Sequence, residues 1–170
     1  MTTDAAPAIT PDFDDGPGAG RKLAIICSKG DLDMAYPGLI LANGALGEGV
    51  ETHLFFTFWG LDIITRSRMA HLRFTPLGNT ATHMPQVLGG VPGVTAMATR
   101  MMRRQIAEVG VPDVPELLDL IAAAGGHLWA CRMSVDMMRL TAGDLHESVE
   151  GIINAGGFIE QTDGAQLLFV

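Results

Sequence analysis

Two continuous apolar runs stand out in the first third of the chain. Residues 23–27 (LAIIC) are bounded by charged residues and glycine, and such a run is typical of a strand buried on both faces. Residues 50–59 (VETHLFFTFW) are rich in aromatic and β-branched types and predict a second strand. Strands covered on both faces belong mostly to parallel sheets, so the pattern favours a parallel sheet.

The segments between and after these runs carry helical patterns. Residues 34–49 have Pro37 where a first helical turn tolerates it, and Gly47 and Gly49 where a helix ends. Residues 61–69 predict a short helix, and residues 141–145 a turn or a short capped helix. Further helices are predicted at residues 94–109, 135–140 and 152–161, and another begins with residues 115–121 and ends at Gly125 and Gly126. Further strands are predicted at residues 127–131, 148–149 and 166–170.

Strands that alternate with helices at this spacing predict an α/β domain. We expect a flavodoxin-like three-layer sandwich, with a mainly parallel sheet of four to five strands in a flavodoxin-like order. Residues 1–20 are acidic and predict a disordered tail, so residues 21–170 form a single domain. Residues 74–99 contain no Asp, Glu, Lys or Arg, and their prolines and glycines favour a buried or interface-forming loop over a membrane helix.

Composition narrows the classes of function. The net charge is −8, with 11 Lys and Arg against 19 Asp and Glu, which argues against nucleic acid as a partner. Hydrophobic residues make up 48% of the 170 positions and charged residues only 18%, so we expect surplus apolar surface and self-association. Only two cysteines are present, and the first 20 residues do not have the pattern of a signal peptide. Both observations favour a reducing compartment, and we expect a cytoplasmic protein.

The two cysteines end predicted strands. In an open α/β sheet, functional groups gather at the carboxyl ends of the strands, where Cys27 and Cys131 both lie. Cys131 precedes a predicted helix with Ser134 as its N-cap, and the free amides and positive dipole end of a helix favour a thiolate. A cysteine in an apolar strand is, however, often an inert core residue. Position alone leaves both interpretations of Cys131 open, and the case for a reactive Cys27 is weaker.

Other polar residues offer less specific signals. Ser28, Lys29 and Gly30 could cradle an anion with their backbone amides, although a plain turn from strand to helix is the better explanation of them. Asp31 and Asp33 are candidate acid–base groups, but Asp before a helix is commonly a cap.

The histidines show no metal-ligand spacing, and those at positions 53 and 127 are expected to be structural residues within strands. The many methionines are interpreted as core and interface residues and not as copper ligands. We therefore expect neither a metal nor an organic cofactor.

Three segments in order resemble the DsrE/DsrF-like sulfur-relay family. They are residues 22–61, residues 84–106 (MPQVLGGVPGVTAMATRMMRRQI) and residues 130–138 (ACRMSVDMM), within a resemblance that covers residues 22–170. The similarity is greatest to a subgroup of DsrE-type sulfur carriers that is often labelled peroxiredoxin family. Neither cysteine lies in a Thr-x-x-Cys motif, so the resemblance does not carry peroxide chemistry to this chain.

The resemblance implies a flavodoxin-like fold, a homo-oligomer and a cytoplasmic sulfurtransferase or sulfur carrier. The cysteine of the ACxMxxDxM stretch, here Cys131, would hold sulfane sulfur as a persulfide and pass it to a partner thiol by thiol exchange. Rhodanese-like or TusA-like carrier proteins are the implied partners. Cys27 stands where relatives in this subgroup commonly have an apolar residue, so the resemblance gives it no role.

Two alternatives remain open from the sequence. The chain could be a non-catalytic oligomeric scaffold, in contact with a membrane surface, in which Cys131 is structural. It could also be a redox enzyme that pairs Cys27 with Cys131, which requires Cα atoms within about 7 Å.

Overall fold

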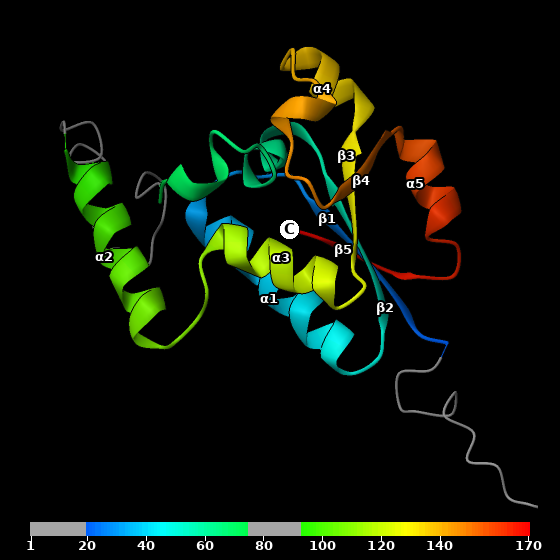
Figure 1. Cartoon of the computed structure of the whole chain (residues 1–170), viewed down its shortest axis with the longest axis horizontal. Helices are drawn as coiled ribbons and strands as arrows, with labels where there is room; N and C mark the ends of the chain where they lie inside the picture. The colour runs from blue at the N-terminus through cyan, green and yellow to red at the C-terminus, as the bar shows by residue number, and fades with distance from the viewer. Residues whose placement is uncertain (1–19, 75–92) are drawn as a thin grey trace, which may run out of the picture.

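A single five-stranded parallel sheet organises the structure, a computed structural model that describes residues 20–74 and 93–170 (Figure 1). The strands are β1 (Lys22–Cys27), β2 (Glu51–Phe56), β3 (His127–Cys131), β4 (Val149–Ile153) and β5 (Gln166–Phe169). Their order across the sheet is β4-β3-β2-β1-β5. The predicted α/β class with a mainly parallel sheet is confirmed.

The strand order differs from the flavodoxin-like order that we expected. In that order, 2-1-3-4-5, β1 lies between β2 and β3. Here β2 lies between β1 and β3, and β5 pairs with the other edge of β1. The expected order is therefore wrong: the chain after β2 returns to the free edge of β2, and the last strand takes the position beside β1.

Five α-helices and three short 3-10 helices connect the strands in the described residues. The α-helices are α1 (Leu32–Gly47), α2 (Val94–Glu108), α3 (Val114–Ala123), α4 (Arg132–Met137) and α5 (Ala155–Gln161). The 3-10 helices are η2 (Phe58–Ile63), η3 (Met69–His71) and η6 (Ala142–Asp144). Every predicted α-helix after residue 90 is present, with shifted ends.

Of the boundaries that were predicted wrongly, three have a clear local reason. β2 ends at Phe56 because Phe58 adopts a φ of 46°, which is incompatible with an extended strand, and η2 begins there. α1 begins at Leu32, so Pro37 lies in its second turn and not in its first. Ile152 and Ile153 belong to β4, because Asn154 caps α5 by accepting a hydrogen bond from Gly157 N.

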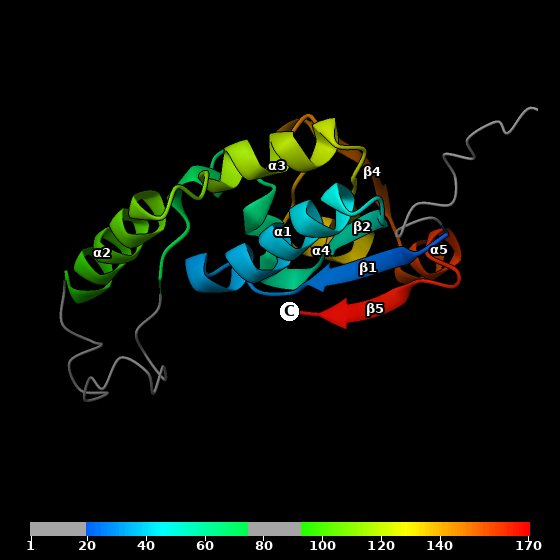
Figure 2. The ribbon, with the colours of Figure 1, turned by 90° about the horizontal axis from the view of Figure 1, so that it is seen from below.

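Helices cover the two faces of the sheet unequally. α1 and α3 cover one face and enclose the main core, in which Ile25, Leu54 and Leu128 of the strands are fully buried (Figure 1, Figure 2). α5 lies against the other face, where the ring of Phe158 stacks on Phe55 with centroids 4.6 Å apart. We refer to these as the α1 face and the α5 face of the sheet.

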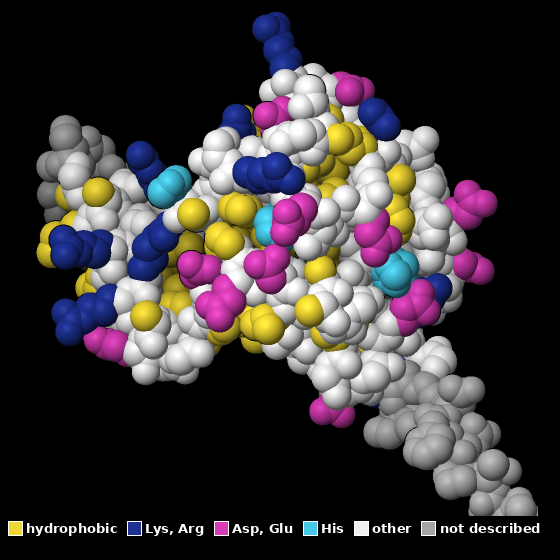
Figure 3. Space-filling view, viewed as in Figure 1, with side chains coloured by type: hydrophobic (Ala, Val, Ile, Leu, Met, Phe, Trp, Pro, Cys, Tyr) yellow, Lys and Arg dark blue, Asp and Glu magenta, His cyan; other side chains and the backbone are white. Residues whose placement is uncertain are grey.

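α2 lies apart from the sheet, beyond the amino-terminal end of α1 (Figure 2). In Figure 3, Lys and Arg side chains lie over α2 and along the top of the molecule, whereas most Asp and Glu side chains lie over its middle and right. Met97 and Met101 of α2 are exposed, as the expectation of surplus apolar surface predicts. Among the described helices, none is long and apolar enough to cross a membrane.

Some predictions lie outside the described residues. These are the tail predicted for residues 1–20, apart from Gly20, and residues 75–92 of the uncharged segment 74–99. At the ends of that segment, Phe74 is buried, and its backbone N–H donates to the hydroxyl of Thr99 in α2.

Gly60 brings η2 against the end of β1. A Cβ atom at Gly60 would collide with the carbonyl oxygen of Cys27, which already accepts a hydrogen bond from Thr57 N at 3.0 Å. Only glycine therefore permits this approach. The contact fixes the segment from Thr57 to Gly60 over the carboxyl ends of the strands.

We predict that Gly60→Ala destabilises the protein by about 2 kcal/mol or more, because backbone would have to move to admit the methyl group. Gly44→Ala is the matched control: Gly44 lies within α1, and a Cβ there meets nothing within 4 Å. That change should stabilise the protein by about 0.5–1 kcal/mol. Urea unfolding curves measure both free energies, and equal effects of the two changes would contradict the close approach.

Candidate functional site

Cys131 is both the last residue of β3 and the N-cap of α4. Its backbone is extended, with φ −71° and ψ 118°, and α4 begins at the next residue. Its side chain is 6% exposed and packs with Phe55 and Phe158 on the α5 face. The cysteine thus lies where the sequence places it, at a strand end before a helix.

Ser134 has a different position from the one we predicted. It is not the N-cap of a helix that starts at residue 135; it lies inside α4, fully buried. Its hydroxyl oxygen accepts a hydrogen bond from the backbone N–H of Phe58 at 2.8 Å and lies 3.2 Å from the hydroxyl of Thr57. Because a hydroxyl carries one hydrogen and two lone pairs, Ser134 can accept from both Phe58 and Thr57 and still direct its own hydrogen at a further acceptor.

The lowered pKa of Cys131 indicates that its sulfur is such an acceptor. Burial by itself raises the pKa of the Cys131 thiol, but hydrogen bonds from the side chains of Thr57 and Ser134 and from the backbone amides of Ser134 and Met133 outweigh it. The pKa of Cys131 therefore lies below the ordinary value for cysteine. The two amides contribute although Cys131 forms no regular N-cap hydrogen bond. A larger share of this thiol is thus ionised near neutral pH, which makes it the better nucleophile.

Cys27 is a contrasting case at the end of β1. Its side chain is 1% exposed, belongs to the core of the α1 face, and has its pKa raised to about 12 by burial. Both cysteines are free, and β2 lies between their strands. Two strand spacings separate the Cα atoms by about 10 Å, beyond the reach of a disulfide. The alternative of a redox pair between Cys27 and Cys131 is therefore inconsistent with the structure.

The predicted supporting residues after β1 do not meet the Cys131 sulfur. Ser28 donates from both its backbone N–H and its hydroxyl to the carbonyl oxygen of Val170, at 2.9 and 3.1 Å. Lys29 and Gly30 line a separate cavity of about 490 Å³ together with Trp59 and two arginines. A Cβ atom at Gly30 would collide with the carbonyl oxygen of Trp59, so this glycine serves a close backbone approach.

Thr57 is the site residue that our sequence reasoning missed. The run of residues 50–59 was interpreted as one strand, which gave Thr57 no special place. In the structure, β2 pairs with β3 in parallel, with Phe56 beside Ala130, so the next residue of each strand brings Thr57 beside Cys131. An alignment of the two predicted strands as parallel neighbours could have indicated that Thr57 lies beside Cys131.

Exposed apolar side chains belong to the two segments that flank the sulfur. Phe58 and Trp59 come from η2, and Met133 and Met137 from α4. Large exposed apolar groups beside a buried reactive group are typical of a surface that docks another protein. We refer to these four residues as the apolar rim.

The histidines of β2 and β3 lie side by side, although they are far apart in the sequence. His53 and His127 are register partners, and their rings stack with centroids 4.4 Å apart. Each has a carboxylate partner, Glu51 for His53 and Glu150 for His127. Both are hydrogen-bonded, as expected for structural residues, but the proximity of the pair to a carboxylate was not foreseen.

Comparison with known proteins identifies relatives along most of the chain. The model of the DsrE/DsrF/DrsH-like family matches residues 19–169. The sulfur carrier protein DsrE2 of Allochromatium vinosum is 38% identical over 148 residues, which cover 82% of this chain and 91% of that protein. The uncharacterized protein YrkE of Bacillus subtilis is 23% identical over 155 residues, covering 88% of this chain and 97% of that protein.

Two solved structures share the fold. The ychN protein of Escherichia coli matches with a TM-score of 0.56 and 14% identity over 88% of this chain and 99% of that chain. The protein MTH1491 of Methanobacterium thermoautotrophicum, described as being of unknown function, matches with a TM-score of 0.55 and 10% identity over the same shares. At these identities the likeness concerns the arrangement of helices and strands.

We predict that iodoacetamide modifies Cys131 and spares Cys27 in the native protein, and that the rate for Cys131 rises at lower pH than for an ordinary thiol. Ser134→Ala removes a hydrogen-bond donor to the thiolate, so the pKa of Cys131 rises and alkylation at pH 7 slows about three- to tenfold. Intact mass against time, from pH 5 to pH 10, measures the rate.

Cys27→Ser is the control and should leave this pH profile unchanged. Thr57→Val removes the other hydroxyl and keeps the volume, so it should raise the pKa in the same direction. A native Cys131 that resists alkylation, or that titrates like a free cysteine, would contradict the activated thiol.

Proposed function

This chain belongs to the DsrE/DsrF/DrsH-like family, and on that premise we propose that it carries sulfane sulfur as a persulfide on Cys131 and passes it to a thiol of a partner protein. The observation that carries the proposal is the environment of Cys131. Two hydroxyls and two backbone amides lower the pKa of a thiol at the carboxyl end of a central strand. The similarity to a sulfur carrier protein in A. vinosum supports the same chemistry.

The proposed transfer is a thiol exchange without net oxidation. The Cys131 thiolate attacks the outer sulfur of a donor persulfide, R–S–SH, the S–S bond of the donor breaks, and the donor leaves as the thiolate RS⁻. Cys131 is then Cys–S–SH. An acceptor thiolate repeats the attack on the outer sulfur and restores the Cys131 thiolate. Neither step requires an oxidant, a metal ion or an organic cofactor.

Each hydrogen-bond donor around the sulfur has a function in this exchange. The Cys131 thiolate is both the attacking group of the first step and the leaving group of the second. Thiolates of low pKa leave faster, and enough of the thiolate is present near neutral pH to attack. Thr57 and Ser134 therefore assist uptake and release of sulfur through the same hydrogen bonds.

The apolar rim gives the proposed partner a surface on which to dock. Cys131 is almost fully covered, so a donor must bring its persulfide close to the segments η2 and α4 that flank the sulfur. Rhodanese-like or TusA-like carrier proteins, which the family resemblance implies as partners, are the proposed donors and acceptors. We place the relay in a reducing compartment such as the cytoplasm, because the chain has only two cysteines and they are too far apart to pair.

Self-association is part of the proposal. Leu167 and Phe169 of the edge strand β5 point to the α5 face and are 58% and 67% exposed. A second copy of the chain would cover them.

Replacement of Phe169 by Asp should shift the protein to a smaller species in light scattering, and an unchanged mass would remove β5 from the interface.

We predict that treatment with polysulfide, or with thiosulfate and a rhodanese, adds about 32 Da per sulfur atom to the intact mass, and that a reductant reverses the gain. Cys131→Ser should abolish the gain because the acceptor sulfur is absent. Cys27→Ser is the matched control and should retain it.

Retention of the added mass by Cys131→Ser would show that Cys131 is not the carrier. A blank result for the wild-type protein, together with slow native alkylation of Cys131, would instead favour the non-catalytic scaffold. Flotation of the protein with liposomes tests whether such a scaffold binds a membrane surface.

A further inference from the structure

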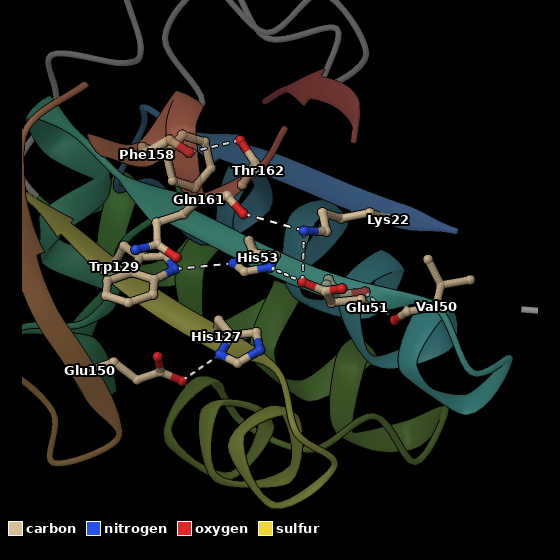
Figure 4. Close-up of polar contacts among 11 residues, drawn as sticks. Lys22, Val50, Glu51, His53, His127, Trp129, Glu150, Phe158, Gln161 and Thr162 are labelled. Atoms are coloured by element: carbon tan, nitrogen blue, oxygen red, sulfur yellow. Dashed lines mark hydrogen bonds and ion pairs between the residues drawn. The ribbon is translucent and has the colours of Figure 1, made fainter. Parts of the chain in front are cut away.

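A second cluster of reactive side chains lies on the α5 face, away from Cys131. Glu51 and His53 of β2 and His127 of β3 form its centre, with Glu150 and Trp129 beside them (Figure 4). His127 is four residues before Cys131 on β3, or about 13 Å along the strand. The cluster therefore lies near the amino ends of the strands, separate from the proposed sulfur site.

The strand register assembles this cluster. Alternate residues of a strand share one face, so Glu51 and His53 point to the same side of β2. His127 is the register partner of His53, which places the two imidazoles side by side. One ligand atom from each of Glu51, His53 and His127 lies within 4.8 Å of the other two. Two imidazoles and a carboxylate are a ligand set that proteins use for zinc.

The partner of His127 prepares its ring as a ligand. Nδ1 of His127 lies 2.7 Å from Oε1 of Glu150, and an ionised carboxylate only accepts hydrogen bonds. The proton of a neutral His127 is therefore on Nδ1, and Nε2 carries the lone pair. A histidine whose other nitrogen donates to a carboxylate is the usual arrangement of histidine ligands in metal sites.

The partners of His53 fix its tautomer. Trp129 Nε1 can only donate, and it lies 3.3 Å from Nδ1 of His53. The ring proton of His53 is then on Nε2, directed at Oε1 of Glu51 at 2.8 Å.

We propose that Glu51, His53 and His127 bind a divalent transition-metal ion of the zinc type. Coordination by Nε2 of His53 displaces the proton on that atom, and Nδ1 takes up a proton, so the ring stays neutral. Nδ1 then carries a hydrogen and cannot accept the hydrogen bond of Trp129. Metal binding therefore breaks the hydrogen bond between Trp129 and His53 and changes the surroundings of the Trp129 indole.

Lys22 opposes the ion and gives the proposal a directional test. Its ammonium group lies 3.0 Å from Oε1 of Glu51, the same oxygen that faces His53 (Figure 4). A cation bound by the cluster is repelled by this ammonium group. Replacement of Lys22 by Met should therefore tighten metal binding, whereas loss of a ligand should weaken it.

The test is calorimetric titration of the untagged full chain with Zn²⁺. We expect one ion per chain, and at least a tenfold loss of affinity in His53→Ala, His127→Ala and Glu51→Gln. His71→Ala, which removes an exposed histidine elsewhere, should have no effect. Cys131→Ser should also leave the affinity unchanged, which separates this site from the sulfur chemistry. Lys22→Met should bind several times more tightly.

Fluorescence gives a second measurement that does not depend on calorimetry. Co²⁺ should quench the emission of Trp129, so quenching should be lost in Trp129→Phe and kept in Trp59→Phe. His127→Asn provides a smaller change if His127→Ala fails to fold. Binding weaker than about 100 μM, or binding unaffected by both His53 and His127 variants, would overturn the proposal.

Discussion

The parallel pairing of β2 with β3 sets the geometry of both clusters on the α5 face. The register puts His53 beside His127 at one end of the strands and Phe56 beside Ala130 near the other. A shift of one residue would turn every side chain of β2 to the opposite face. Leu54 and Leu128, fully buried against the helices of the α1 face, resist such a shift because it would expose them. The hydrophobic core thus fixes the position of the reactive groups on the other face.

The environment of Cys131 combines parts from distant segments of the chain. β3 supplies the sulfur, α4 supplies Ser134 and two amides, and the residue after β2 supplies Thr57. Gly60 holds η2 close to β1, so the backbone N–H of Phe58 reaches the Ser134 hydroxyl. This last hydrogen bond orients Ser134 by occupying one of its lone pairs, which leaves the hydroxyl hydrogen for the sulfur. The thiol is therefore activated by hydrogen bonds that outweigh the effect of burial, and no charged group of the described residues is among the causes of its lowered pKa.

The sequence predicted the central features and missed those that depend on contacts between strands. The apolar runs of β1 and β3 are continuous and short, so they defined two strands and placed Cys131 at a strand end. The end of β2 was missed because a positive φ at Phe58 has no signature in an aromatic run. Ser134 was assigned as a cap because Ser is common there, yet Cys131 has the N-cap backbone conformation itself. The cluster of histidines was not visible because each strand contributes only one, and the register joins them.

The location of the two cysteines on opposite faces of the sheet has a consequence for any sulfur that reaches Cys131. Many thiol proteins contain a resolving cysteine, which attacks the first sulfur and closes a disulfide within the same molecule. Here the second thiol is enclosed by α1 and the core and is protonated at physiological pH, since its pKa is about 12. The chain has no third cysteine. A sulfur atom held on Cys131 therefore cannot be discharged internally, and it stays until a thiol of another molecule takes it.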